Sequence, residues 1–505
     1  MSKKEFDLSR REFLLKSTLL SASAVATPFA MDLFGMNAAM ASTLTGDYKA
    51  LVCIFLAGGN DHNNMVLATD TPSWNGYLGA RNVNGSSIAL SLGSLLSITP
   101  ATTKVDSVGT REFKLHPQLT GIKNLFDAGR AAIIANVGTL SRPISDKTVY
   151  RNNASWRPAN LFSHSDQTTL WQSTDTTKRN YGWGGRMADR IKSSNTTPNF
   201  TSLSMAGSTT FLAGETLNQY QINNNGVPVP ISGTNGFDGL FGSIDSGDNF
   251  TKKITTGPTS GNLFEIAHAN VVQRAIDAQS NLQSVMTKTT APIVPAPSTY
   301  LNPNTNTQQT NPLAVQMQTV ARLIAGRNLL GAHRQIFFVT LGGFDTHDFQ
   351  TSSQANLFAR LSHAIEYLDT TLGSLVDVND GTSSNMRSAV TTFTASDFGR
   401  TFASNGDGTD HGWGSHHFVI GGAVNPGKST GDIYGTFPMT AVTGTTSYGT
   451  FDNPLDVGSG NTIPQIAVDE YAGTLAKWFG LSAAEVLEVF PYLSSYGSTD
   501  LGFMA

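Results

Sequence analysis

Four short runs of apolar residues stand out along the chain, and each predicts a buried β-strand. Every run is closed by glycine or by a turn that carries an aspartate. A continuous apolar run of this length is typical of a strand covered on both faces, as in a parallel sheet. The runs are Ala50–Ala57, Ala131–Val137, Gln335–Leu341 and Ser388–Thr394.

Between and after these runs, apolar residues recur at helical spacing. Leu119–Ala128, with Ile122, Leu125 and Phe126 on one side, lies between the first two runs. The order strand, helix, strand predicts a parallel βαβ unit. Further helices are predicted over Leu357–Leu375, Gln465–Phe479 and Ala483–Phe490. We therefore expect an α/β fold in which helices sandwich a largely parallel central β-sheet.

The stretch from about Ser194 to Pro312 has a different composition, rich in Ser, Thr, Asn, Gly and Pro. We interpret it as a loop-rich insertion with one helix near Leu263–Met286 and a flexible portion over Thr290–Asn311. The chain length allows one large α/β domain or two ordinary ones. We expect a single domain over residues 42–505 that carries this insertion.

The N-terminal residues have the features of a twin-arginine (Tat) export signal. Arg10 and Arg11 precede a mostly apolar stretch from Ser17 to Ala30, and Ala39-Met40-Ala41 supplies the small residues that signal peptidase accepts. The alternative is an ordinary amphipathic helix with a chance arginine pair. We expect residues 1–41 to be a signal peptide, the Tat translocase to be a partner during export, and the mature protein to be periplasmic or secreted. No stretch resembles a stable transmembrane anchor.

The composition narrows the classes of function. Only 14% of residues are charged and the formal net charge is −4, so nothing favours nucleic acid as a partner. Cys53 is the single cysteine, which excludes an internal disulfide. It lies inside the first apolar run, and we expect it to be a buried core residue.

Aspartates and histidines gather where the predicted strands end. In open α/β sheets, sites lie at the carboxyl ends of the strands, so these residues are candidates to converge. Mixed Asp and His ligands suit zinc, manganese or iron, and two such ions would clamp a phosphoryl or sulfuryl oxygen. The alternative for each residue is a turn, a helix cap or a buried hydrogen bond. The candidate ligands are Asp61, Asp345, His347, Asp397, Asp410, His411 and His416.

Six segments resemble, in order and spacing, a bacterial family catalogued as domain of unknown function 1501, along nearly the whole chain from Tyr48 to Phe503. They are Leu51–Asp61, Leu115–Pro117, Phe162–His164, Gly342–His347, Asp397–Thr401 and Gly408–Gly412. That family is grouped with the alkaline phosphatase and sulfatase superfamily. The resemblance implies a parallel sheet between helices, with divalent metal at the strand ends. Zinc is the expected ion, with manganese, iron and calcium as alternatives.

The resemblance also implies roles for particular positions. The superfamily's first-strand aspartate matches Asp61, its later Asp/His pair matches Asp345 and His347, and its next acid and final histidine match Asp397 and His411. The chain departs from the superfamily at Phe398, where a metal-binding histidine is usual. A complete two-metal site would then need Asp410, His416 or His417 to compensate.

The reacting groups are less well defined by the sequence. Ser163, His164 and Ser165 begin a predicted helix and form the best candidate segment for a nucleophile, with a helix cap beside a buried histidine as the equal alternative. Ser141 is a second candidate. Arg400 could pair with a substrate oxyanion or brace Asp397.

These residues predict an exported metal-dependent hydrolase that acts on a phosphate or sulfate ester, either a small molecule or a glycan. No Cys/Ser-x-Pro-x-Arg sequence of the kind that sulfatases convert to formylglycine is present. The alternative function is a non-catalytic member of the same fold that serves in envelope assembly or glycan binding.

Overall fold

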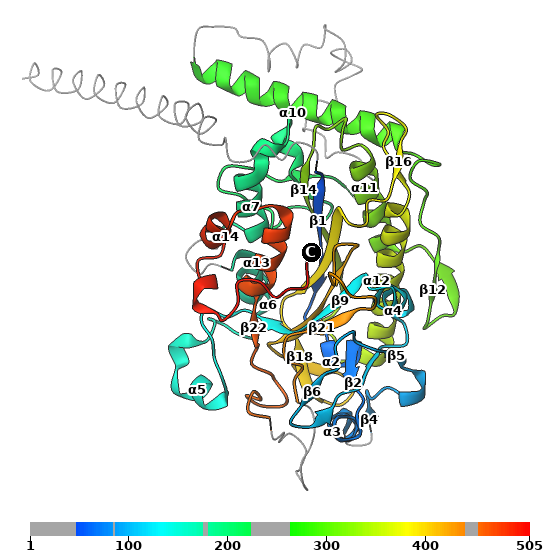
Figure 1. Cartoon of the computed structure of the whole chain (residues 1–505), viewed down its shortest axis with the longest axis vertical. Coiled ribbons are helices and arrows are strands. Elements are labelled where there is room, and N and C mark those ends of the chain that lie inside the picture. The colour runs from blue at the N-terminus through cyan, green and yellow to red at the C-terminus, as the bar shows by residue number, and fades with distance from the viewer. Residues whose placement is uncertain (1–46, 84–85, 175–179, 224–262, 440–452) are drawn as a thin grey trace, which may run out of the picture. The chain divides into compact units, whose positions relative to one another are not determined.

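A central, mostly parallel sheet organises the residues from Tyr48 to Ala505, which cluster as one unit apart from Met1–Asp47 (Figure 1). The computed structural model describes residues 47–83, 86–174, 180–223, 263–439 and 453–505. The predicted signal peptide therefore lies outside the described residues. Within them, no helix combines the length and the apolar character needed to cross a membrane.

The described sheet has nine strands. Eight follow one another side by side, and β22 (Ile466–Ala467) pairs with β9 beside them. In spatial order the eight are β11 (Tyr220–Gln221), β10 (Ser202–Ser204), β14 (Arg334–Gly342), β1 (Lys49–Ala57), β17 (Val390–Ser396), β20 (Ser415–Ile420), β9 (Ala131–Gly138) and β21 (Asp432–Tyr434). Only β20 runs against its neighbours. The predicted class, α/β with a largely parallel central sheet, is confirmed at this level.

The four predicted strands form the middle of this sheet as β1, β9, β14 and β17. All residues of β1 except the two at its ends are buried. Both faces of the strand are therefore covered, which explains why the run is apolar without alternation. The predicted βαβ unit needs a correction, because β1 and β9 run the same way but are not neighbours. Strands β17 and β20 lie between them, and β20 was not expected as a strand.

Helices cover both faces of the sheet (Figure 1). On one face, α4 (Thr120–Asp127), α11 (Pro312–Ala325) and α12 (Gln350–Leu372) share a hydrophobic core with alternate residues of β1, including Val52 and Ile54. The other face carries an aromatic core in which Trp171 contacts Phe55 and Tyr471 contacts Phe393. Its helices are α6 (His164–Ser173), α7 (Trp183–Ile191), α13 (Val468–Phe479) and α14 (Ala483–Val489).

The predicted insertion contributes to the sheet as well as to the surface. Strands β10 and β11 extend the sheet at one edge, and α10 (Leu263–Lys288) packs against α11. A hairpin of β12 (Tyr300–Asn302) and β13 (Thr307–Gln309) contacts α12.

Smaller elements complete the described fold. Helices α2 (His62–Met65) and α3 (Thr71–Arg81) follow β1, and α5 (Lys147–Asn152) follows β9. A three-stranded sheet has the order β2 (Val66–Ala68), β8 (Phe113–Leu115) and β5 (Leu96–Ile98). Two-stranded pairs are β18 (Arg400–Ser404) with β19 (Thr409–His411), β3 (Asn82–Val83) with β4 (Ser86–Ser87), β6 (Val105–Asp106) with β7 (Gly109–Thr110), and β15 (Leu375–Val376) with β16 (Ser383–Ser384).

The carboxyl ends of β1, β14 and β17 meet at one edge of the sheet because the three strands are parallel neighbours. Gly58 marks how closely the chain segments approach there. Its φ is +116°, and a Cβ on it would lie 2.4 Å from the backbone nitrogen of Asp345. Any larger residue at this position would separate the end of β1 from the turn that follows β14.

Candidate metal centre

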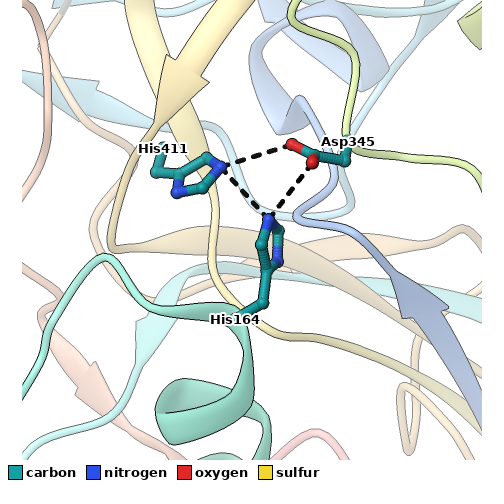
Figure 2. Close-up of side chains that lie close together, drawn as sticks. All are labelled: His164, Asp345 and His411. Carbon is teal, nitrogen blue, oxygen red and sulfur yellow. Dashed lines mark hydrogen bonds and ion pairs between the residues drawn. The ribbon is translucent and has the colours of Figure 1, made fainter.

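Four side chains converge at this edge of the sheet, and three of them are drawn in Figure 2. Asp345 and His347 follow β14, His411 ends β19, and His164 is the first residue of α6. The Nε2 atoms of His164 and His347 lie 3.1 and 3.0 Å from Nε2 of His411. Asp345 approaches all three imidazoles, at 3.4, 3.0 and 3.3 Å from His164, His347 and His411.

Hydrogen bonds on the far side of two rings determine which nitrogen faces the cluster with a lone pair. Nδ1 of His411 lies 2.8 Å from the carbonyl oxygen of Phe162, and Nδ1 of His164 lies 2.7 Å from Oδ2 of Asp397. Both oxygens accept, so each Nδ1 carries the proton. In the neutral rings, both Nε2 lone pairs then point into the cluster. Two lone pairs 3.1 Å apart repel unless a proton or a metal cation lies between them.

Three of these residues have donor atoms close enough together to share one cation. With metal–nitrogen distances of about 2.0–2.1 Å, the ligand atoms around zinc are about 3.3 Å apart. The donor atoms of His164, Asp345 and His411 all lie within 4.8 Å of one another, whereas His347 lies close to Asp345 and His411 only, at the edge of this group. Three imidazoles and one carboxylate suit zinc, manganese or iron and do not suit calcium, which prefers oxygen ligands.

Arg400 fixes the carboxylate of this cluster. Its Nη1 donates to Oδ1 of Asp345 at 2.8 Å and to the carbonyl of Gly58 at 3.1 Å, while its other nitrogens donate to Thr409. Burial alone would raise the pKa of Asp345. The hydrogen bond and charge of Arg400 outweigh it, and the pKa lies below its ordinary value. Asp345 is therefore ionised and available as a ligand at neutral pH.

Asp397 contacts the cluster indirectly, through a hydrogen bond to His164. Its Oδ1 accepts from the backbone N–H of Gly58 and its Oδ2 accepts from His164. The hydrogen bond to Asp397 is the largest cause that raises the pKa of His164, whereas burial lowers the pKa of His411. A carboxylate that orients an imidazole in this way is the usual outer partner of a metal-binding histidine. In this structure Asp397 orients the candidate ligand His164, whereas the sequence predicted Asp397 itself as a ligand.

Water and substrate can reach the cluster. The side chains of His164, Asp345 and His347 are 33%, 45% and 42% exposed. On the inner side the cluster is closed by Phe398, a buried residue whose ring centroid lies 4.7 Å from that of His164 and 4.8 Å from that of His411. A centre with protein ligands on one side and solvent on the other is the arrangement of catalytic metal sites rather than of closed structural ones.

Two of the predicted ligands do not join this cluster. Asp61 forms a fully buried ion pair with Arg81 at 2.6 Å, and Gln350 donates to the same carboxylate oxygen at 2.6 Å. His416 lies within β20, where its Nδ1 accepts from the backbone N–H of Asn136. Its burial, reinforced by neighbouring histidines, holds its pKa far below the ordinary value. Both residues are part of the folded core.

Asp410, another predicted ligand, lies at the rim of the cluster. Its Oδ1 is 3.4 Å from Nδ1 of His347, and the side chain is 62% exposed. Asn405 donates to the same oxygen at 3.1 Å. Asp410 therefore faces the outer nitrogen of a candidate ligand.

The predicted reacting residues separate in the structure. Ser163 is the N-cap of α6, where its Oγ accepts from the backbone N–H of Asp166 and donates to the Asp166 carboxylate at 2.7 Å. Ser165 lies 3.2 Å from Ser163, Oγ to Oγ. Arg400 pairs with Asp345, neither bracing Asp397 nor standing free for a substrate. His164, grouped with the serines by sequence, is the residue that reaches the cluster.

The sequence indicated His164 as a catalytic candidate beside the two serines, and its place in the Asp/His cluster was not foreseen. Its position as the first residue of a helix was visible, but its distance along the chain from Asp345 hid the contact. Strand β20 was missed as well, because His416 and His417 drew attention to metal binding in a segment that is wholly buried. The apolar residues Phe418–Ile420, directly after the two histidines, were the available signal for a strand.

Fold and site together define a mixed α/β protein with a candidate Asp/His metal centre at the carboxyl edge of its sheet. Residues 259–461 match the model of a family described as a protein of unknown function, DUF1501. The matched region contains Asp345, His347 and His411, whereas His164 precedes it. This supports the resemblance to that family. No curated protein matches the chain.

Proposed function

We propose that this protein is an exported metal-dependent hydrolase of phosphate or sulfate esters, built on an alkaline phosphatase/sulfatase-like fold. The observation that carries the proposal is the pair of Nε2 atoms of His164 and His411, 3.1 Å apart, with both rings held by outer acceptors. Such an arrangement needs a positive charge between the rings. Asp345 supplies a third donor of a type suited to zinc, and His347 lies beside Asp345 and His411 as a further candidate ligand.

One cation, rather than two, fits the donor set. Asp61 is paired with Arg81, and Phe398 occupies the position at which the superfamily usually has a metal-binding histidine. When bound, the metal would polarise the ester oxygen and lower the pKa of a bound water. Phe162 and Asp397 hold the two imidazoles in orientation, and Arg400 holds the carboxylate.

Water is the proposed nucleophile. The Oγ of Ser163 is engaged with Asp166 as a helix cap, and no contact of Ser165 brings its hydroxyl to the donor atoms. The ester type comes from the resemblance to the phosphatase and sulfatase superfamily, and the open side of the cluster supports access for a small or glycan-borne ester. Export through the Tat translocase to the periplasm or beyond rests on the twin arginines Arg10 and Arg11.

The decisive test is metal content, measured by elemental mass spectrometry on protein exported through its own signal and purified without chelators or a histidine tag. We expect about one equivalent of zinc, manganese or iron. His347→Ala combined with His411→Ala should abolish it, and Asp397→Asn should weaken metal affinity about 10–100-fold. The matched control is His333→Ala, at the opposite end of β14, which should keep the metal.

Activity is then measured on aryl phosphate and aryl sulfate esters. Hydrolysis that follows metal content across these variants supports the proposal. A folded, metal-free wild-type protein overturns it.

A second candidate function is a metal-binding but non-catalytic role in envelope assembly or glycan binding. The observation that favours it is the absence of a hydroxyl nucleophile among the contacts of the described cluster, together with Phe398 on its floor. One equivalent of metal without turnover of any phosphate or sulfate ester would select this function.

A further inference from the structure

A second candidate site lies beside α6, away from the metal-binding atoms. It is a cavity of about 680 Å³, within the size range of pockets that hold small ligands. The segment after β9, the segment before α6, the body of α6 and the segment after α14 all contribute to it. Its lining includes Ser141, Arg142, Arg157, Leu170, Tyr492 and Ser495, and none of the lining residues that the structure describes carries a carboxylate.

The two arginines give the cavity a positive charge that no described residue neutralises. Among the described residues, no carboxylate lies within ion-pair distance of Arg142 or Arg157. The guanidinium of Arg142 stacks over Trp156 with 5.1 Å to the ring centroid, and Arg157 stacks over Tyr150 at 4.0 Å. Stacking uses the face of a guanidinium and leaves the N–H groups around its edge free to donate.

The hydrogen bonds of the two arginines also leave some of their N–H groups free to donate. Arg157 donates from Nε to the carbonyl of Tyr150 and from Nη2 to that of Arg151, which holds the side chain in place and leaves Nη1 as a spare donor. The side chain of Arg142 makes no hydrogen bond within the described part of the chain. Arg157 is held by these hydrogen bonds and exposed Arg142 by its stacking on Trp156, and two guanidinium groups with spare donors can recognise an oxyanion.

We propose that this cavity binds an oxyanion group, a sulfate, phosphate or carboxylate, carried on a sugar. Serine hydroxyls at 141, 155 and 495 supply partners for sugar hydroxyls, and Leu140, Pro158 and Leu170 supply an apolar surface for a ring face. Leu170 lies six residues after His164 on α6, a rise of about 9 Å along the helix. The cavity therefore neighbours the metal centre, but its ligand does not depend on metal or on turnover.

Isothermal titration calorimetry tests this proposal on the full chain in phosphate-free buffer. The probes are sodium sulfate, a sulfated disaccharide and a neutral disaccharide. All are titrated into the wild type and into His347→Ala/His411→Ala, so that binding at the metal centre is separated from binding in the cavity. We expect saturable binding of both anions in both proteins and none of the neutral sugar. Tighter binding of the sulfated disaccharide than of sulfate identifies the sugar-borne group, whereas equal affinity assigns the cavity to a free inorganic anion.

Variants link the binding to the cavity. Arg142→Gln should weaken it at least 10-fold, and Arg142→Lys should weaken it less, because the charge stays while the planar donors are lost. The matched control is Arg190→Gln, a surface arginine paired with Glu488, which should change nothing. The proposal is overturned if the wild type shows no saturable anion binding, or if Arg142→Gln, with unchanged thermal stability, binds as the wild type does. Neither result would bear on the hydrolase proposal, which is decided by metal content.

Discussion

Asp61 illustrates how a single residue can suggest one role in the sequence and take another in the structure. It follows a buried strand directly, which is where a metal ligand belongs in an open α/β sheet. Arg81, twenty residues later, supplies a buried guanidinium at 2.6 Å, and Gln350 donates to the same oxygen. A carboxylate with these partners is satisfied, so its position at the strand end serves the fold.

The buried Asp61–Arg81 pair predicts a large effect on stability. Asp61→Asn removes the charge that compensates Arg81 and should lower the free energy of unfolding by about 3–5 kcal/mol, while metal content stays unchanged. Urea unfolding and elemental mass spectrometry measure the two quantities. The control is Asp127→Asn, at an exposed pair with Lys123, which should cost less than about 1 kcal/mol. Loss of metal at unchanged stability would return Asp61 to the set of ligands.

Phe349 is a position at which a substitution should raise the free energy of unfolding. It has a left-handed backbone, with φ of 52°, and its side chain is 75% exposed, so the strain is not offset by burial. Asparagine tolerates this conformation, and Phe349→Asn should raise the free energy of unfolding by about 1 kcal/mol. Phe349→Leu keeps the strain and should bring no gain. Equal unfolding midpoints for Phe349→Asn and the wild type in urea would contradict the prediction.

At the scale of elements, α6 connects the helix layer to the candidate centre. Its first residue, His164, enters the cluster, and its cap, Ser163, determines where the helix begins. A helix start is a local property that sequence can indicate. The approach of that start to the turn after β14 depends on how the helix packs against the sheet, which no local pattern records.

The cap of α6 gives a prediction that distinguishes a structural role of Ser163 from a catalytic one. Ser163→Ala removes the acceptor for the N–H of Asp166 and should lower the free energy of unfolding by about 1 kcal/mol. Metal content and any ester hydrolysis should remain. Ser165→Ala, two residues on, should change stability by less than about 0.5 kcal/mol. If Ser163→Ala abolishes hydrolysis while the metal stays bound, Ser163 is the nucleophile after all.

At the scale of the whole molecule, single contacts join segments that are far apart in the chain. Asp432 on β21 accepts from Thr102 at 2.6 Å and pairs with Lys104 at 2.9 Å and Lys428 at 2.6 Å. Burial opposes ionisation of this carboxylate. The hydrogen bonds from Lys428, Thr102 and Lys104 outweigh burial and lower its pKa from 3.8 to about 2.

This shift predicts how stability depends on pH. The unfolded chain takes up the Asp432 proton near its ordinary pKa of 3.8, before the folded protein does. The stabilisation is therefore complete above that pH and is lost as the pH falls toward about 2. Asp432→Asn should be less stable than the wild type at pH 7, with the difference shrinking between pH 4 and 2 in urea unfolding. Glu488→Gln, at an exposed pair, is the control and should show no comparable trend. A difference that stays constant over this range would contradict the assignment.

The sequence by itself determined the central strands, several helices and the chemical inventory. Apolar runs gave β1, β9, β14 and β17, and helical spacing gave α4, α12, α13 and α14, although α12 begins seven residues before the predicted start. These signals are local, because a buried strand must be apolar wherever it lies in the sheet. Glycine turns after β1 and β14 also placed Asp345 and His347 at the correct edge.

Only the tertiary structure decided which candidates meet. Asp345, His347, His411 and His164 come from three separate segments, and their contact depends on strand order and helix packing rather than on spacing along the chain. Strand β20 lies between β17 and β9, which buries His416. The ion pair with Arg81 keeps Asp61 out of the candidate metal centre. The local sequence pattern indicates which chemistry a residue is capable of. The tertiary structure decides which partner residues lie close enough for that chemistry.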